Sequence, residues 1–459
     1  MSNTISEQLA KINAFYSTGA TRSFSFRKEQ LIKLKKILLK YEDEIYAALG
    51  SDLSKSKEES YASEFVLLIG EINHTLKNLN NWMQPQTVRT TLVNLPSSSK
   101  IYRDSLGVVL IIAPWNYPLQ LLLIPFVGAI AGGNCAVLKP SELAPATAAI
   151  TEKIITETFL PDYVKVFNGD GATLIPQLMH EFRFDHVFYT GSTAVGKIIY
   201  KMAAEKLIPV TLELGGKSPG IVEADANLEV AARRLVLGKF INAGQTCIAP
   251  DYLLVHTSVK DELVKNIIRT IEKFYGSSTV NSYDYGKIIN EKRFDKLVSY
   301  LQTGNILYGG RHDRNRLWIE PTLLDQVPLD SFLMTEEIFG PLLPLLTFET
   351  TQEAINVVQQ NPEPLAFYVF TSSSKKEKDW IERIHFGGGC INNTAWHFAN
   401  KDFPFGGVGY SGMGAYHGLH SFNTFTREKP VMKTPTWFDP SFKYPPMKGR
   451  LNFFKRFIN

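Results

Sequence analysis

The 459-residue chain carries one long, mostly apolar run in which no position is charged. From Ser105 to Leu138 there is no Asp, Glu, Lys, Arg or His, and three prolines interrupt the run. This pattern predicts a buried strand (108–113), a proline-bounded loop, an apolar helix and a second buried strand (135–139). Continuous apolar strands on either side of a helix are typical of a parallel sheet that is covered on both faces.

The same apolar run is long enough to be mistaken for a membrane span. In lipid, however, the side chains of Asn116, Gln120 and Asn134 would have no hydrogen-bond partners, and the prolines would interrupt a spanning helix. We therefore interpret the run as the buried centre of a sheet rather than as a membrane segment.

Elsewhere the pattern changes from region to region. Apolar residues repeat at helical spacing over 31–41 and 65–76, which predicts a helical N-terminal third. Residues 85–104 are polar, β-branched and punctuated by proline, which indicates an exposed arm or hairpin. Farther on, strands and helices alternate, with Asp225 as the expected N-cap of a helix that runs towards Phe240. The predicted fold is α/β, with two parallel-sheet domains and an arm.

The formal net charge of +4 is unevenly distributed. From Lys443 to Asn459 the chain carries five basic residues and no acid, so residues 1–442 sum to −1 (+4 minus +5). A body this close to neutral argues against a nucleic-acid partner. The last segment is rich in aromatic, proline and basic residues, and it predicts a tail that lies on some other surface.

Three cysteines lie far apart, without CxxC spacing. This pattern argues against a disulfide framework or a structural zinc site, and, with an N-terminus that lacks the apolar core of a signal peptide, it favours the cytoplasm. An unperturbed thiol is only about 3% thiolate at pH 7, so a reactive Cys247 would need a helix N-terminus or a cation nearby. The alternative, a small buried hydrophobe, is what we expect for Cys135 and Cys390.

Two glycine-rich turns compete as a dinucleotide site. The turn Gly191, Ser192 and Gly196 follows a strand and opens a helix, so its N–H groups would face an anion such as phosphate; the alternative is a plain turn capped by Ser192. The residues 407–412 spell GxGxxG, but no apolar strand precedes them and the next acid lies near the tail. We interpret this second turn as structural.

Two further polar residues occupy apolar surroundings. Glu213 lies between two leucines at the end of a predicted strand, which favours a raised pKa and a role as general base; the alternative is an ion pair with a nearby Lys or Arg. Asn116 lies in the proline-stiffened segment PWNYP, where its amide could donate to an oxyanion, or could be an ordinary loop residue.

The order of the motifs is more specific than any one of them. The series PWNYP, KPSE, GST-x-x-G, ELGGKSP, GQTC, EEIFGP and PFGG resembles the aldehyde dehydrogenase superfamily over residues 20–447. The details GKF-x-N-x-GQTC-x-APDY, PFGGVG-x-SGMG-x-YHG and YPP are similar to its class 3, fatty-aldehyde-type branch. The resemblance implies two Rossmann-like domains and an oligomerisation arm in a homodimer. The expected ranges are 1–84 and 105–210 for NAD binding, 85–104 and 415–442 for the arm, 211–414 for catalysis and 443–459 for the tail.

The resemblance also implies a mechanism. Cys247 would attack an aldehyde, Asn116 and the Cys247 N–H would hold the oxyanion, and Glu213 would activate the water that hydrolyses the thioester. The expected cofactor contacts are Trp115, Lys139, Glu142, Gly191, Ser192, Gly196, Glu337 and Phe339. Glu142 would repel a 2′-phosphate, so we predict NAD as the preferred cofactor, with NADP left open.

For the substrate, the expected tunnel residues are Tyr117, Leu237 and Phe405. Because Leu237 stands where some relatives carry a bulky aromatic, the predicted substrate is a fatty or polyenal aldehyde, among them a carotenoid-derived aldehyde such as diaponeurosporenal. The alternatives are a broad-specificity detoxifying enzyme, a coenzyme A-dependent acylating dehydrogenase, a thiol esterase and a binding protein without chemistry. The basic tail would lie either on an anionic membrane, as peripheral contact, or on the partner subunit.

Overall fold

The computed structural model describes residues 4–455, and the first of its sheets has six strands. In order across the sheet these are β17 (Gly412–Met413), β7 (Val210–Glu213), β6 (His186–Thr190), β3 (Val108–Ile112), β4 (Cys135–Lys139) and β5 (Val164–Val166). All neighbours are parallel except β17, which runs antiparallel to β7. The predicted apolar strands β3 and β4 are buried throughout and pair directly, as the sequence indicated.

In this part of the chain, helices pack against the strands and also against other helices. The connecting helices are α6 (Gln120–Gly132), α7 (Pro145–Thr158), α8 (Gly171–Glu181) and α9 (Thr193–Glu205). Before them come α1 (Ile5–Ser17), α2 (Phe24–Lys40), α3 (Glu42–Leu53), α4 (Lys57–Ser60) and α5 (Val66–Trp82). Every residue of α6 is buried because α2, α5 and α16 (Gly418–Thr424) pack against it, which explains its lack of polar positions.

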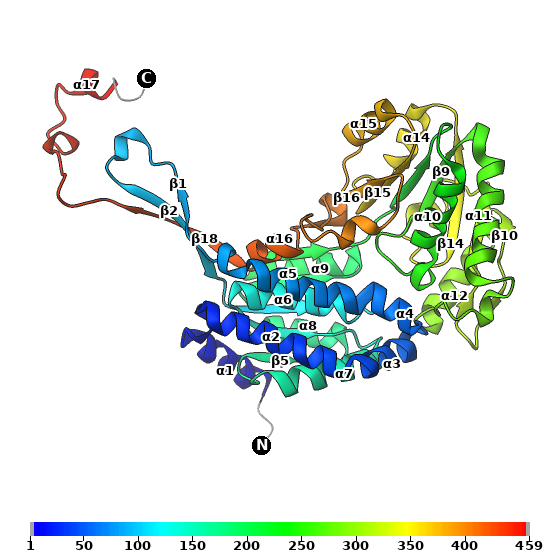
Figure 1. Cartoon of the computed structure of the whole chain (residues 1–459), viewed down its shortest axis with the longest axis horizontal. Helices are drawn as coiled ribbons and strands as arrows, with labels where there is room; N and C mark the ends of the chain where they lie inside the picture. The colour runs from blue at the N-terminus through cyan, green and yellow to red at the C-terminus, as the bar shows by residue number, and fades with distance from the viewer. Residues whose placement is uncertain (1–3, 456–459) are drawn as a thin grey trace.

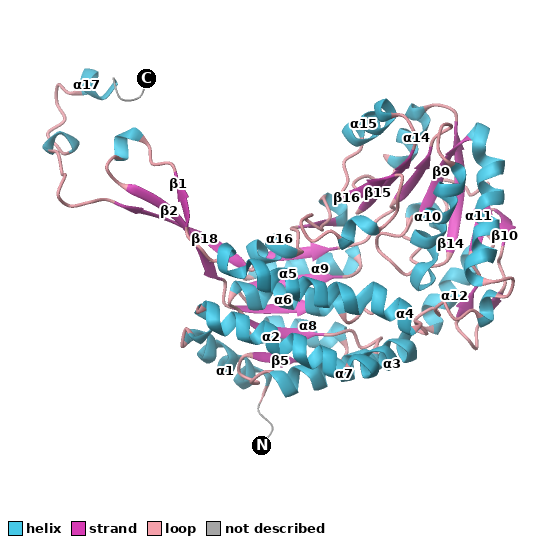
Figure 2. Ribbon diagram, viewed as in Figure 1, coloured by secondary structure: helices cyan, strands magenta, loops and turns pink. Residues whose placement is uncertain are grey.

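A second sheet forms a separate body, visible to the right in Figures 1 and 2. Its order is β10 (Asn305–Tyr308), β13 (Thr322–Asp325), β14 (Leu342–Phe348), β9 (Tyr252–His256), β8 (Pro219–Val222), β15 (Ala366–Phe370) and β16 (Gly388–Ile391). Only β10 is antiparallel to its neighbour. Its helices are α10 (Leu228–Phe240), α11 (Lys260–Tyr275), α12 (Glu291–Tyr300), α13 (Phe332–Thr335), α14 (Thr351–Val358) and α15 (Ser374–Arg383), and β11 (His312–Asp313) pairs with β12 (Trp318–Ile319).

One detail of α10 differs from expectation. Its N-cap is Asn227, whose side chain accepts from the Val230 N–H, and not Asp225. The Asp225 carboxylate is already occupied, because it accepts hydrogen bonds from the hydroxyls of Thr371 and Ser372. Asp and Asn are both favourable N-cap residues, so the contacts of Asp225 with a distant segment explain why Asn227 caps the helix instead.

An arm projects away from the two bodies (Figure 1). It is a three-stranded antiparallel sheet of β1 (Gln86–Val88), β2 (Ser98–Ser105) and β18 (Thr426–Lys433), so the predicted hairpin gains a third strand from near the end of the chain. Beyond β18 lies the tail, with α17 (Leu451–Lys455). The tail, which the sequence predicts to lie on another surface, is described only in part, because residues 456–459 and the side chains of Phe453 and Phe454 lie outside the described residues.

The sequence predicts that the apolar run is not a membrane-spanning helix. Within residues 4–455, none of the helices combines the length and the apolar composition that crossing a bilayer requires. The apolar run that begins at Ser105 is divided between β3, α6 and β4, and α6 has only 13 residues.

Candidate active site

The first sheet gathers predicted residues at the carboxyl ends of its strands. The chain runs outwards from β3 through β4 to β5 and then returns to β6 beside β3, so the strand order reverses between β3 and β6. In open α/β sheets, ligands bind outside the carboxyl ends at such a reversal. The residues at this edge are Trp115, Asn116 and Tyr117 after β3, Lys139 and Glu142 at the end of β4, Gly191 and Ser192 after β6, and Glu213 as the last residue of β7.

The second body contributes Cys247 on a tightly folded loop. In the turn Ile241–Gly244, which follows α10, Asn242 and Ala243 have φ values of 52° and 51°, and Gly244 has 74°. A Cβ on Gly244 would lie 2.3 Å from the carbonyl oxygen of Gly340, so the position accepts only glycine. The loop before the thiol is therefore packed against the segment that contains Glu337 and Phe339.

Gln245 fixes this loop from inside. Its amide nitrogen donates to the carbonyl oxygens of Asn242 (3.0 Å) and Lys287 (2.9 Å), and its amide oxygen accepts from the Ile289 N–H (3.0 Å). Its own carbonyl accepts from the Asn116 amide at 3.1 Å. A buried side chain that uses all of these groups holds the Cys247 loop and the Asn116 loop in one arrangement.

Sequence reasoning did not identify the support beneath Asn116. Lys55 and Glu64 form a fully buried ion pair at 2.7 Å. The Lys55 ammonium also donates to the Asn116 carbonyl (3.0 Å), and Glu64 accepts from the Leu119 N–H (2.9 Å). A lysine and a glutamate in a helical N-terminal region gave no local signal for this role, because their partners lie more than 50 residues away.

The thiol of Cys247 is not in the environment that we expected. Cys247 is half-buried, yet burial raises its pKa to about 12, and the negative charges of Glu337 and Glu213 add to the rise. Backbone hydrogen bonds from Cys247 and Ile248 oppose it only in part. Among the described residues, no cation contributes to the shift in the pKa of Cys247, and its raised pKa favours the protonated thiol at neutral pH.

Glu213 is the most desolvated carboxyl of the group. It is 2% exposed, neither of its oxygens has a hydrogen-bond partner among the described residues, and burial raises its pKa well above the usual value. Within residues 4–455, Glu213 does not form the alternative ion pair with Lys or Arg. The GxGxxG turn has a structural part here, because Gly412 pairs with Glu213 across β17 and β7, and a Cβ on Gly412 would meet the Leu212 carbonyl at 2.2 Å.

The residues predicted to hold a dinucleotide form two groups. Lys139 and Glu142 form an ion pair beside Gly171. Burial alone would raise the pKa of Glu142, but the hydrogen bond from Lys139 helps to bring the pKa below its usual value. Trp115 and Phe339, from different bodies, meet edge to face with centroids 5.4 Å apart.

Ser192 caps α9, and that helix begins at the same sheet edge, after β6. These groups suit a dinucleotide, because they comprise an ionised hydrogen-bond acceptor, a helix N-terminus that can bind an anion, and two aromatic rings.

The residues predicted to line the substrate tunnel lie in three different surroundings. The Tyr117 hydroxyl lies 2.6 Å from the Thr246 hydroxyl, next to Cys247. The ring of Phe405 is stacked between the imidazoles of His397 and His417, at 6.1 and 5.3 Å. The side chain of Leu237 lies near the end of α10 and is 37% exposed.

The remaining two cysteines differ from each other. Cys135 is fully buried in β4, and burial raises its pKa to about 12, as expected for a structural residue. Cys390 in β16 is only half-buried, with its sulfur 3.6 Å from Nδ1 of His397.

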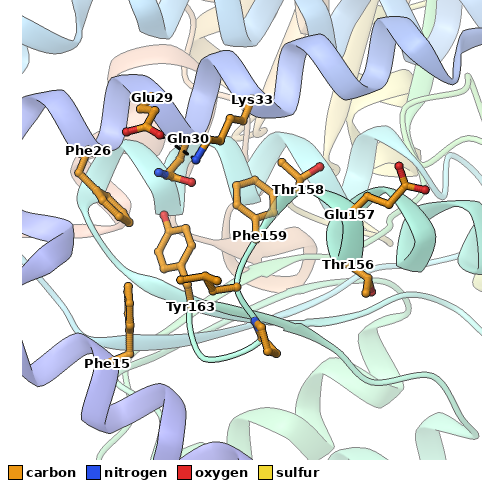
Figure 3. A pocket seen from close by; sticks show the side chains of 12 residues that line it. Phe15, Phe26, Glu29, Gln30, Lys33, Thr156, Glu157, Thr158, Phe159 and Tyr163 are labelled. Carbon is orange, nitrogen blue, oxygen red and sulfur yellow. Dashed lines mark ion pairs between the residues drawn. The ribbon is translucent and has the colours of Figure 1, made fainter.

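A cavity of about 500 Å³ lies elsewhere, between α1, α2 and the end of α7 (Figure 3). Phe15, Phe26, Phe159 and Tyr163 line it, with the Glu29–Lys33 ion pair at its rim. None of the predicted site residues lines this cavity. We therefore place the active site at the sheet edge, where the chemistry-bearing groups converge, and not in this cavity.

Comparison with known sequences agrees with the geometry. The sequence model of the aldehyde dehydrogenase family matches residues 4–431. The chain is 48% identical over 458 residues to the 4,4′-diaponeurosporen-aldehyde dehydrogenase of Staphylococcus aureus (strain NCTC 8325 / PS 47), covering 99% of each chain. It is 42% identical to aldehyde dehydrogenase family 3 member H1 of Arabidopsis thaliana, covering 99% of this chain and 95% of that one.

Solved structures give the same result. The substrate-bound state of Staphylococcus aureus AldH superposes with a TM-score of 0.98 at 47% identity, covering 100% of both chains. A mutant of the P. syringae indole-3-acetaldehyde dehydrogenase AldA, in complex with NAD+ and IAA, gives a TM-score of 0.86 at 27% identity, covering 94% of this chain and 89% of that one. The predicted fold class, enzyme class and nicotinamide cofactor are confirmed. The chain belongs to the aldehyde dehydrogenase family.

Proposed function

We propose that this protein oxidises a long apolar aldehyde, with an alkyl or polyene chain, to the carboxylic acid with NAD as oxidant. The observation that carries the proposal is the convergence of an accessible thiol, Cys247, with a carboxyl that has no other partner, Glu213, and with an anchored amide, Asn116. These are a nucleophile, a base and an oxyanion donor within one site.

The first step is addition of the Cys247 sulfur to the aldehyde carbon, which gives a thiohemiacetal. The thiol proton passes to solvent as the carbon–sulfur bond forms, and Glu213, whose proton affinity is raised by burial, acts as the base of the second half-reaction. The Asn116 amide has two N–H groups; one donates to the Gln245 carbonyl, so the second is available for the oxyanion. A donor of this kind contributes about 10²–10³ in rate.

The second half-reaction releases the acid. NAD, when bound, would supply the hydride acceptor, and loss of hydride from the substrate carbon would leave a thioester on Cys247. Glu213 then takes a proton from a water molecule, the water attacks the thioester carbon, and the carboxylic acid leaves as the thiol is restored. Apolar residues around Glu213 favour this role, because a solvated carboxylate would be a weaker base.

We assign the cofactor contacts to both bodies of the chain. Lys139 and Glu142 would hold the adenosine ribose, and the turn of Gly191, Ser192 and Gly196 would face the pyrophosphate. Glu337 would hold the nicotinamide ribose, and Trp115 and Phe339 would enclose the ring. The negative charge of Glu142 supports a preference for NAD over NADP, because a 2′-phosphate would be repelled.

The apolar substrate is supported by the side chains around the expected tunnel. His397 and His417 stack on Phe405, and burial lowers their pKa values to about 4 and about 3, so this wall is uncharged at neutral pH. Each buried methylene contributes about 0.8 kcal/mol, so an apolar wall favours long chains. The S. aureus relative is named for 4,4′-diaponeurosporen-aldehyde, and a carotenoid-derived aldehyde of that kind is our specific candidate.

A panel of aldehydes tests this proposal. NADH absorbance is followed with saturated aldehydes from C3 to C12 and with polyenals, in the absence of coenzyme A. We expect kcat/KM to rise with chain length and to be highest for polyenals. A flat series would contradict the apolar substrate and favour a broad-specificity detoxifying enzyme.

The acylating reaction is the second candidate function. It would pass the thioester to coenzyme A, and the water-activating position of Glu213 argues against it. Release of free acid without coenzyme A supports hydrolysis, whereas NADH formation that requires coenzyme A would establish the acylating reaction.

We also propose a homodimer with an additional surface contact through the tail. The arm and tail expose large apolar side chains, among them Leu92 (75%), Trp437 (78%) and Leu451 (64%), beside basic residues. Deletion of residues 449–459 distinguishes the two expected partners. Loss of binding to anionic liposomes with the dimer intact supports a peripheral membrane contact. Unchanged liposome binding with a weaker dimer places the tail on the partner subunit.

The domain ranges expected from the sequence and a cytoplasmic location are part of the same proposal. Free cysteines at positions 135, 247 and 390 support a reducing compartment.

A further inference from the structure

Lys55 and Glu64 form an ion pair in which neither side chain is exposed to solvent, with Nζ and Oε1 2.7 Å apart. Taking two charges out of water is costly, and a buried pair recovers that cost only through good geometry and further hydrogen bonds. The partners of those further bonds therefore indicate what the pair does. Within residues 4–455, every other hydrogen bond of the two side chains goes to one segment, 116–120, which follows β3 and ends at the first residue of α6.

The Lys55 ammonium holds the beginning of this segment. It donates to the backbone carbonyl of Asn116 at 3.0 Å, and its nitrogen lies 4.0 Å from the centroid of the Tyr117 ring. A carbonyl oxygen has two lone pairs, and that of Asn116 also accepts from the Asn242 amide at 2.8 Å. The carbonyl is therefore held from two sides. Because Cα of Asn116 is bonded to this carbonyl carbon, the pair also fixes the point from which the side-chain amide extends.

The Glu64 carboxylate holds the other end of the segment. One of its oxygens pairs with Lys55, and the other accepts from the N–H groups of Leu119 (2.9 Å) and Gln120 (3.3 Å). These N–H groups lie at the start of α6, where no preceding helical turn supplies a carbonyl. Leu119, the N-cap residue, has no side-chain oxygen that could accept from them. Glu64 therefore caps α6 from a distant part of the chain.

The stretch 55–64 also reaches the loop before the thiol. Glu64 lies in η2 (Tyr61–Phe65), a π-helical turn of a kind that is rare and often found at functional sites. Earlier in the stretch, Glu59 accepts from the Asn242 N–H at 3.0 Å. Asn242 has a φ of 52°, a backbone conformation that persists only when its surroundings support it. One short stretch thus supports both loops that the proposed reaction uses.

We propose that Lys55 and Glu64 are positioning residues for the oxyanion donor, Asn116. The ion pair holds the backbone of Asn116 so that the second N–H of its side-chain amide stays where the oxyanion forms. The inference rests on the proposed function, in which Asn116 stabilises that oxyanion. A displacement of about 1 Å can cost about 10²-fold in rate, so a loosely held Asn116 would lose much of its contribution even in a folded protein.

Removal of the Lys55 ammonium tests the proposal through kcat for NADH formation with NAD and a C12 aldehyde. Lys55→Met should lower kcat by about 10–10²-fold. The matched control is Lys260→Met, which breaks an ion pair with Asp325 (2.6 Å) at the end of β13 in the second body. The control should lower the melting temperature and leave kcat unchanged. A wild-type kcat in folded Lys55→Met would overturn the inference.

A double-mutant cycle separates positioning from a general loosening of the fold. If Lys55 acts through Asn116, its loss has nothing left to displace once the amide is gone. Lys55→Met should therefore lower kcat strongly in the wild-type background but by less than about twofold in Asn116→Ala, a coupling that independent sites do not show. The same fold-decrease in both backgrounds would show that Lys55 does not act through Asn116.

The variant Lys55→Met/Glu64→Gln separates rate from stability. Loss of one partner leaves an uncompensated buried charge, which is strongly destabilising, whereas the double variant carries no charge at this place. It should melt at a higher temperature than Lys55→Met, while its kcat stays low because the Asn116 carbonyl still lacks its donor. Recovery of the wild-type kcat would refute positioning. The double variant carries the test if Lys55→Met does not fold, and Glu64→Asp, which keeps both charges on a shorter side chain, carries it if neither folds.

Failure of the proposed function would give a different result. Wild-type protein that forms no NADH with any aldehyde of the panel, or Asn116→Ala with a wild-type kcat, would refute the role of Asn116 itself. A low kcat in Asn116→Ala together with a wild-type kcat in Lys55→Met would refute only the positioning by the ion pair.

Discussion

The side-chain amide of Asn116 donates to the backbone carbonyl of Gln245 over 3.1 Å. This bond joins the loop after β3 in the first sheet to the loop before Cys247 in the second body. A second bond returns from the Asn242 amide to the Asn116 carbonyl at 2.8 Å. Because the two loops hold each other, the proposed oxyanion donor, Asn116, and the proposed nucleophile, Cys247, are positioned as one unit.

Replacing Asn116 by Ala should therefore lower kcat by about 10²–10³ through loss of the oxyanion donor. The matched control is Asn134→Ala, which removes a buried amide that donates to Phe425 far from the thiol. That control should lower the melting temperature without a comparable loss of kcat in the folded protein. A decrease of less than tenfold in Asn116→Ala would remove the residue from the reaction.

Cofactor choice should respond to the charge at position 142. Glu142→Gln removes the repulsion of a 2′-phosphate, and the ratio of kcat/KM with NADP to that with NAD should rise about tenfold, which corresponds to about 1.4 kcal/mol. The control Glu152→Gln changes a carboxylate on the neighbouring helix α7, where it accepts from Asn168, and should leave the ratio unchanged. Wild-type protein that uses NADP more efficiently than NAD would contradict the assignment.

Stability should decrease in mild acid because of buried histidines. Burial lowers the pKa of His186 to about 4, so the unfolded chain binds a proton below pH 6.5 while the folded chain stays neutral until about pH 4. The neutral, buried histidine therefore makes its full contribution to the free energy of unfolding above pH 6.5. This contribution falls by about 2 kcal/mol for one such histidine between pH 7 and pH 5. Urea unfolding at both pH values should show a smaller loss for His186→Gln. An equal loss in both proteins would show that other groups control acid stability.

Chain-length preference should depend on the space at Leu237. Leu237→Trp would fill the expected tunnel, and we predict about a tenfold loss of kcat/KM for C12 relative to C3 aldehydes, the equivalent of nearly two buried methylenes. Leu160→Trp, at an exposed position distant from the site, is the control. An equal loss at every chain length would mean that Leu237 does not line the tunnel.

Much of the fold could be predicted because its signals are local. The strands β3 and β4 are continuous apolar runs, and the turn before α9 contains its own cap, Ser192. These features depend on residues a few positions apart. The prediction of Asp225 as the N-cap of α10 was wrong, because its carboxylate accepts a hydrogen bond from the distant hydroxyl of Thr371.

The electrostatics of the site could not be predicted in the same way. The ion pair of Lys55 and Glu64 supports a loop 61 residues after Lys55, and Gln245 meets Asn116 across 129 residues. The raised pKa of Cys247 follows from burial and from two carboxyls on separate segments. The order of the sequence motifs predicts which residues react, whereas the protonation of these residues depends on which segments the fold brings together.

The most direct test of the account is rapid-mixing measurement of NADH with Glu213→Gln, NAD and a long-chain aldehyde. Hydride transfer precedes the step that needs the base for water, so we predict a burst of up to one NADH per site followed by near-complete arrest, and no burst in Cys247→Ser. Steady-state turnover unchanged from wild type in Glu213→Gln would contradict the account.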